Sequence, residues 1–89
     1  MIFQIDATDK TPEIDFSPVT GVLKIKGISI PEDSKEFYRG LYMEIEEYLQ
    51  DPLEWSVVEL HLEYFNTSTT LFLRDLMKKY RQANQIGIT

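Results

Sequence analysis

Residues 58–65 alternate between apolar and polar side chains, a pattern typical of a β-strand with two unlike faces. After them come five short polar residues, 66–70, of which four carry hydroxyl groups. Apolar residues then recur at three- and four-residue spacing up to Ala83, as they do along one stripe of a helix. The pattern therefore predicts a strand, a hydroxyl-rich turn and a helix over residues 71–83. One face of the strand carries Val58, Leu60, Leu62 and Tyr64, and the other carries Glu59, His61 and Glu63.

Earlier in the chain, three short alternating segments predict further strands. Residues 2–5 suit an edge strand, and residues 13–16 and 22–28 suit the two arms of a hairpin. The intervening residues 17–21 contain a proline and Gly21, which tolerates the positive φ that such a turn requires.

A helix is predicted between these strands and the strand at residues 58–65. Asp33 or Ser34 can cap its start through a side-chain oxygen. Asp51 ends it, because a residue before a proline is pushed out of the helical region. Its apolar stripe contains Phe37, Leu41, Ile45, Tyr48 and Leu49, with Tyr38 and Tyr42 on the flank.

Residues 86–89 alternate again and predict a last strand, so the element order is β-β-β-α-β-α-β. The final β-α-β unit would form a right-handed crossover between parallel strands. Because each helix carries one apolar stripe, we expect a single α/β (α+β) domain over residues 1–89. In that domain a mixed sheet has both helices packed on one face.

Size and charge narrow the function classes. The chain has 89 residues, no cysteine and a net charge of −6. It has no 18-residue apolar run and no signal-peptide pattern, so we expect a cytoplasmic protein. Its negative charge disfavours nucleic acid and anionic membranes, which bind mainly through basic residues. Protein partners with basic or mixed surfaces and self-association both remain open.

Candidate catalytic groups are sparse. There is no glycine-rich phosphate loop, and His61 is the only histidine. It lies between Glu59 and Glu63 on the polar face of a predicted strand, where a solvated or sheet-pairing role is favoured over catalysis. Three ligands along one strand are spread too far to close around zinc. The sequence therefore predicts no enzyme activity, no cofactor and no metal site.

The hydroxyl-rich turn supports two interpretations. Serine and threonine commonly cap helices, so the turn can be purely structural. Alternatively, it can accept a phosphate, which the free N–H groups of the helix start would hold. A phosphate adds roughly two negative charges and would repel a partner docked there. The residue pattern by itself does not select one hydroxyl.

Several segments resemble the SiaC family of bacterial biofilm-regulation phosphoproteins. The resemblance includes residues 7–14, residues 25–33 with a Gly-x-Ser-x-Pro-Glu pattern, and the Asp75-Leu76-Met77 stretch in the second predicted helix. Its most specific part is the block from Leu62 to Ser68, which contains Tyr-Phe-Asn-Thr-Ser. The similarity covers nearly the whole chain.

The resemblance implies a fold like that of the sulfate-transporter and anti-sigma-antagonist (STAS) domain, and a partner-switching role. A cognate Ser/Thr kinase would phosphorylate Thr67 and a PP2C-type phosphatase would remove the phosphate. The unphosphorylated protein would bind and activate a diguanylate cyclase. We expect the partner-binding residues to be Tyr64, Asn66, Thr67 and Ser68.

Two departures qualify this resemblance. Family members continue with a further strand and helix, so residues 1–89 would form a STAS-like domain without its C-terminal part. Relatives also often place serine and lysine where this chain has Thr69, Thr70 and Leu71. The alternative function is an interaction or oligomerisation domain without a covalent switch, in which Thr67 and Ser68 only cap the helix.

Overall fold

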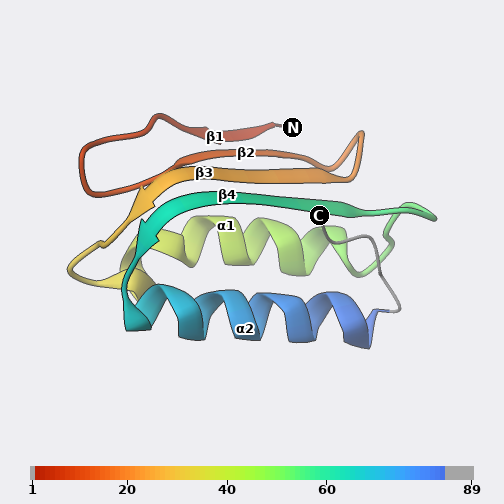
Figure 1. The fold of residues 1–89 in the computed structure, drawn as a ribbon. Coiled ribbons are helices and arrows are strands. Elements are labelled where there is room, and N and C mark those ends of the chain that lie inside the picture. Colours follow the sequence, from red (N-terminus) through yellow and green to blue (C-terminus); the bar gives the residue numbers. More distant parts are fainter. Residues whose placement is uncertain (1, 84–89) are drawn as a thin grey trace.

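A computed structural model describes residues 2–83 as one four-stranded sheet covered by two helices (Figure 1). The order β-β-β-α-β-α agrees with the sequence prediction over this range, and the predicted strand at residues 86–89 lies outside the described residues. The elements are β1 (Phe3–Ile5), β2 (Glu13–Ser17), β3 (Val22–Ser29), α1 (Ser34–Tyr48), β4 (Val57–Phe65) and α2 (Thr67–Gln82).

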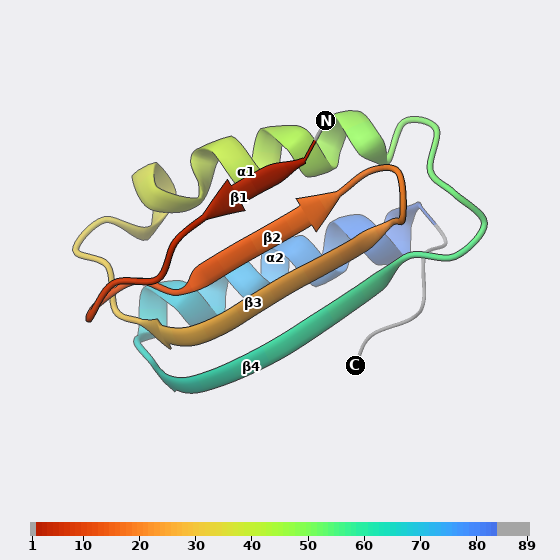
Figure 2. The same cartoon turned by 90° about the horizontal axis from the view of Figure 1, so that it is seen from above.

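The strands follow one another across the sheet in sequence order. The pairs β1–β2 and β2–β3 are antiparallel, whereas β3 and β4 are parallel. A parallel pair needs a long connection, which α1 supplies. Both helices lie against the same face of the sheet, as Figures 1 and 2 show from two directions, so the prediction of a mixed sheet with helices on one face is confirmed.

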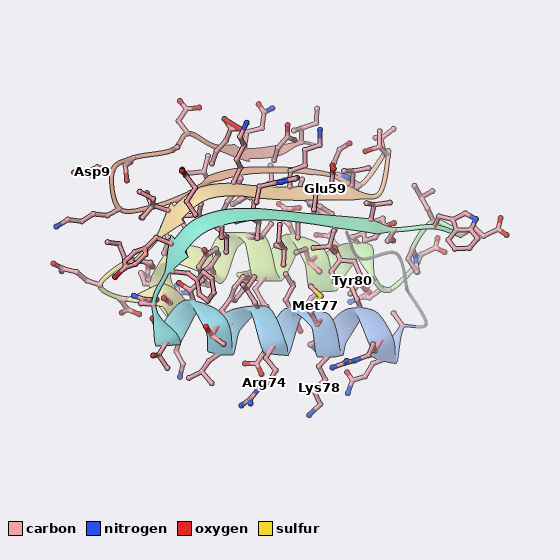
Figure 3. The ribbon with its side chains drawn as sticks, in the orientation of Figure 1. Asp9, Glu59, Arg74, Met77, Lys78 and Tyr80 are labelled. Carbon is pink, nitrogen blue, oxygen red and sulfur yellow. The ribbon has the colours of Figure 1, made fainter. Side chains whose placement is uncertain are left out.

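The core fills the space between the sheet and the helices. Alternate residues of β2 and β3 point into it, because side chains of a strand face opposite sides in turn. In Figure 3, Met77 and Tyr80 point from α2 toward the sheet, while Arg74 and Lys78 point away. The buried apolar side chains are Ile14, Phe16, Leu23, Ile25, Tyr38, Leu41, Ile45, Tyr48, Val58, Leu76 and Tyr80.

Tyr38 lies in this core rather than on the flank of the α1 stripe, where the spacing placed it. Its ring stacks on Phe72 of α2, with ring centroids 4.0 Å apart and planes 9° from parallel. Helix α1 contacts both the sheet and α2, so its buried sector is wider than one stripe. The sequence pattern does not reveal which flank faces a neighbouring helix.

Strand β4 does not keep its simple alternation to the end. The pairing with β3 shifts between Gly27 and Ile28, which face Leu62 and Tyr64. One extra residue, Glu63, is accommodated in β4, as in a β-bulge. Gly27 has φ of 116°, a conformation that favours glycine. Beyond this shift Tyr64 is 65% exposed, so it does not continue the buried row of Val58.

None of the helices within residues 2–83 is both long enough and apolar enough to cross a membrane.

The hairpin turn at Gly21 gives a test of this packing. Gly21 has φ of 72°, and a Cβ atom there would lie 2.7 Å from the Tyr48 hydroxyl oxygen. We expect Gly21→Ala to lower the free energy of unfolding by about 2 kcal/mol or more, since both the backbone and the neighbouring side chain would be strained. Urea denaturation measures the change. The exposed Val19→Ala in the same turn is the control, and equal losses in the two variants would contradict the packing described.

Candidate functional site

The functional site predicted from sequence lies where β4 passes into α2. The pairing of β3 with β4 ends at Ser29 and Phe65, and the Asn66 N–H donates to the Ser29 carbonyl oxygen at 3.1 Å. Asn66 is extended, with φ −97° and ψ 174°, and α2 begins at the next residue, Thr67. The prediction of a five-residue turn before a helix starting at residue 71 is therefore wrong. The polar residues form the N-cap and the first helical turn instead, because Asn66 satisfies the free N–H groups that a helix start exposes.

The side-chain amide of Asn66 fixes this helix start. Its Oδ1 atom accepts from the Thr69 N–H at 3.0 Å and from the Ser68 hydroxyl at 3.0 Å. Its Nδ2 atom donates to the Pro31 carbonyl oxygen at 3.2 Å. One side chain thus joins the end of β4, the first turn of α2 and the segment that leads into α1.

A buried hydroxyl cluster lies beneath the cap. The Ser29 Oγ atom is 2.8 Å from Thr69 Oγ1 and 2.5 Å from the Tyr38 hydroxyl oxygen. Burial raises the pKa of Tyr38 above its ordinary value, although hydrogen bonds with Ser29 and Thr69 oppose that shift. The phenol therefore stays protonated at neutral pH and keeps its hydrogen available for a bond. These bonds satisfy polar groups that would otherwise be costly to bury.

The four hydroxyl groups of the first turn have different environments. Thr69 is buried in the cluster, and the Ser68 Oγ atom lies 2.6 Å from Ser34 Oγ of α1. The Thr70 hydroxyl donates to the Asn66 carbonyl oxygen at 3.4 Å. Thr67 is exposed, and its hydroxyl makes no hydrogen bond with any residue between 2 and 83. Among the four, Thr67 is thus the hydroxyl that is both accessible and structurally unused.

Exposed apolar residues precede and follow Thr67 in the chain. Tyr64 and Phe65 at the end of β4 are 65% and 50% exposed, and Leu71 of α2 is 48% exposed. Leu71 is four residues after Thr67, so the two share one face of the helix. We call Tyr64, Phe65, Asn66, Thr67, Ser68 and Leu71 the junction surface.

Phe65 and Leu71 were not among the partner-binding residues predicted from sequence. For Leu71 a signal was present, because helical spacing puts it one turn after Thr67. For Phe65 the simple alternation was misleading, because the shift at Gly27 pairs it with the buried Ser29 and so places it on the helix side of the sheet. The four predicted residues, Tyr64, Asn66, Thr67 and Ser68, lie within residues 64–68 at the junction, where Asn66 is half-buried and committed to the cap.

A groove borders the junction surface between α1 and α2. It has a volume of about 610 Å³, and Leu71 and Ser68 form part of its wall. Its other lining residues are Glu32, Asp33, Ser34, Lys35, Tyr38, Arg39, Tyr42, Met43, Phe72 and Asp75. The bond between Ser34 and Ser68 holds the starts of α1 and α2 side by side, so the positive ends of both helix dipoles meet at this place.

The structure does not bring residues together for a catalytic or metal site at His61. His61 is exposed and is paired across the strands with Lys26. Glu59 lies on the sheet face away from the helices (Figure 3) and its carboxylate is 3.8 Å from the Lys24 ammonium. Within residues 2–83 no group of three His, Cys, Asp or Glu residues is placed to hold a metal ion.

Comparisons with known proteins agree with this small α+β architecture. A sequence model described as SiaC family regulatory phosphoprotein matches residues 5–89. The chain belongs to the SiaC family.

Individual proteins resemble this chain in sequence or in fold. An uncharacterised protein of Pseudomonas aeruginosa is 34% identical over 86 residues, covering 93% of this chain and 66% of its own length. The crystal structure of apo-SiaC from P. aeruginosa has a TM-score of 0.90 at 28% identity, covering 99% of this chain and 74% of that one. A structure of the diguanylate cyclase SiaD in complex with its activator SiaC matches with a TM-score of 0.87 at 28% identity, covering 97% and 72%.

The different roles of Asn66 and Thr67 predict different stability effects. We expect Asn66→Ala to lower the free energy of unfolding by about 2 kcal/mol, because the cap and the bond to Pro31 are both lost. Thr67→Ala should change it by less than about 0.5 kcal/mol, since the hydroxyl is exposed and unbonded. Chemical denaturation monitored by circular dichroism compares them. A loss in Thr67→Ala as large as that in Asn66→Ala would show that Thr67 takes part in capping.

Proposed function

We propose that this protein is a non-enzymatic regulatory protein whose partner binding is switched by phosphorylation of Thr67. The observation that carries the proposal is the free, exposed Thr67 hydroxyl at the start of α2, in a member of a regulatory phosphoprotein family. The hydroxyl groups of Ser68, Thr69 and Thr70 each take part in hydrogen bonds. Phosphorylation of Thr67 would break none of these bonds, which favours it as the acceptor.

The geometry explains how the modification would act. A phosphate on Thr67 would add about −1.5 to −2 charges at neutral pH. It would lie at the N-terminus of α2, where unpaired N–H groups favour negative charge. It would also lie among Tyr64, Phe65 and Leu71, whose apolar surfaces a partner would cover. Covering a dianion requires its desolvation, so phosphorylation would weaken docking on the junction surface.

A diguanylate cyclase is the partner that the comparisons support best. SiaC of P. aeruginosa is described as the activator of the cyclase SiaD in their complex, and residues of this chain match that structure closely. By analogy, the unphosphorylated form of this protein would bind and activate a cyclase in c-di-GMP and biofilm signalling.

The switch needs two further partners. A Ser/Thr kinase would use ATP to modify Thr67, and a PP2C-type phosphatase would restore the hydroxyl. The requirement for ATP places the cycle in the cytoplasm. This is a partner-switching scheme of the kind expected for STAS-like regulators. The alternative function is an interaction domain without covalent control. The following tests distinguish this alternative from the phosphorylation switch.

The first test concerns the acceptor. Incubation with ATP and a Ser/Thr kinase from the same organism should add one phosphate, which mass spectrometry should map to Thr67. Thr67→Ala should remove the modification, whereas Thr70→Ala, changed at another exposed hydroxyl of the same turn, should retain it. A kinase that is active on a control substrate but leaves Thr67 unmodified would contradict the switch.

The second test concerns binding. We expect Thr67→Asp and phosphorylation at Thr67 each to weaken cyclase binding by about tenfold or more, because charge is placed within the junction surface. Thr70→Asp places the same charge three residues further along α2, outside the residues that form that surface, and should weaken binding less than Thr67→Asp does. Isothermal titration calorimetry measures both. Equal effects of the two substitutions would favour an interaction domain without a site-specific switch.

A further inference from the structure

A second exposed apolar surface lies at the opposite end of the sheet from Thr67. Val19 in the β2–β3 turn is 75% exposed, and Leu53 and Trp55 in the α1–β4 loop are 42% and 67% exposed. The two connections lie at the same end of the domain, and α2 starts at the other end (Figure 2). Large apolar side chains grouped on a surface often mark an interaction site.

Hydrogen bonds hold this loop in place. The Tyr48 hydroxyl oxygen lies 2.6 Å from the buried Ser56 Oγ atom and accepts from the Leu53 N–H at 3.3 Å. The Val57 N–H donates to the Gly21 carbonyl oxygen at 2.9 Å. The Trp55 carbonyl oxygen packs so closely on Gly21 that a Cβ atom there would lie 2.9 Å away. The backbone that presents Trp55 is therefore fixed before any partner arrives, which lowers the entropy cost of binding.

The surroundings of this loop are acidic. A hollow of about 370 Å³ beside Leu53 is lined by Glu44, Glu47 and Asp51, with Pro18 and Tyr48. No Lys or Arg of the described chain lines it. None of the three carboxylates takes part in an ion pair with a residue between 2 and 83. The groove beside Thr67 differs, because it contains Lys35 and Arg39.

We propose that this end of the domain is a second docking surface, which binds a basic, arginine-containing segment of a partner protein. We call Val19, Leu53, Trp55, Glu44, Glu47 and Asp51 the tryptophan surface. Trp55 follows two residues after Leu53, which lines the acidic hollow. A segment with more than one arginine could therefore stack one guanidinium on the exposed indole and pair another with the carboxylates. Aliphatic residues of the segment would cover Val19 and Leu53. Tryptophan is also among the residues that contribute most to binding at interfaces.

The tryptophan surface would work independently of Thr67. The nine residues of β4 separate the two ends by on the order of 30 Å, at about 3.3 Å per residue. The electrostatic screening length at physiological salt is about 8 Å, so a phosphate on Thr67 would have little effect there. A partner held by the tryptophan surface would stay bound while the junction surface gains or loses its phosphate. This independence rests on the proposed switch, whereas the docking itself does not.

A peptide of alternating arginine and leucine can probe the surface directly. Trp55 is the only tryptophan in the chain, so its fluorescence reports binding without a label. We expect a saturable emission change whose affinity falls about tenfold or more as salt is raised from low to several-fold physiological concentration. The same peptide with glutamate in place of arginine should not bind.

Variants assign the binding to the tryptophan surface. Binding of a fluorescently labelled peptide is measured by anisotropy. Trp55→Ala should weaken binding by about tenfold or more. The double variant Glu47→Gln/Asp51→Asn should weaken it by about threefold or more. Tyr64→Ala, which removes an equally exposed aromatic ring at the other end, is the matched control and should change it by less than about twofold. Circular dichroism checks that each variant is folded.

Several results would overturn the proposal. Equal binding of the glutamate peptide, or unchanged affinity in Trp55→Ala, would show that the surface does not recognise arginine. Trp55 fluorescence that acrylamide fails to quench in the free protein would show that another part of the chain or a second copy covers it. Weaker peptide binding in Thr67→Asp would refute independence. Loss of cyclase binding in Thr67→Asp with unchanged peptide binding would support both proposals separately.

Discussion

The side-chain amide of Asn66 is the constraint on which the strand-to-helix junction depends. Its oxygen accepts hydrogen bonds from the first turn of α2, and its nitrogen donates to Pro31 before α1. A helix start leaves several N–H groups without partners, and one well-placed oxygen decides where the helix begins. Because Asn66 takes this role, the neighbouring threonine is free of it. Because adjacent residues have different roles, the exposed Thr67 hydroxyl can be modified without loss of the helix cap.

The hydroxyl cluster below the cap extends this constraint into the core. Ser29 ends β3, Tyr38 belongs to α1 and Thr69 belongs to α2, so their hydrogen bonds join three elements at one point. Hydrogen bonds are directional, whereas apolar contacts tolerate sliding and rotation. The cluster therefore sets the positions of the two helix starts relative to the sheet. The stacking of Tyr38 on Phe72 reinforces that alignment from the apolar side.

The sequence was sufficient to predict most of the fold. Alternation in β2 and β3 and helical spacing around Leu41 and Leu76 are local signals, and the structure confirms them. The burial of Tyr38 depends on the packing of α2 beside α1, a tertiary contact that the local sequence pattern does not encode. The first residue of α2 depended on which of five neighbouring polar residues accepts the capping bonds. Propensity alone ranks asparagine and serine about equally for this role. The exposure of Tyr64 followed from a pairing shift opposite Gly27, which no pattern in β4 by itself reveals.

The unbonded state of the Thr67 hydroxyl has a consequence for how a regulated pool of this protein would be maintained. Attaching a group there breaks no intramolecular bond, and a negative charge at a helix N-terminus is, if anything, mildly stabilising. The modified and unmodified forms would then be folded to the same extent and would be equally poor substrates for proteases that attack unfolded chains. Their ratio would record only the balance between the enzymes that add and remove the group. Protein turnover would then not change the ratio of modified to unmodified protein. The modified fraction would persist for as long as the removing enzyme stays inactive.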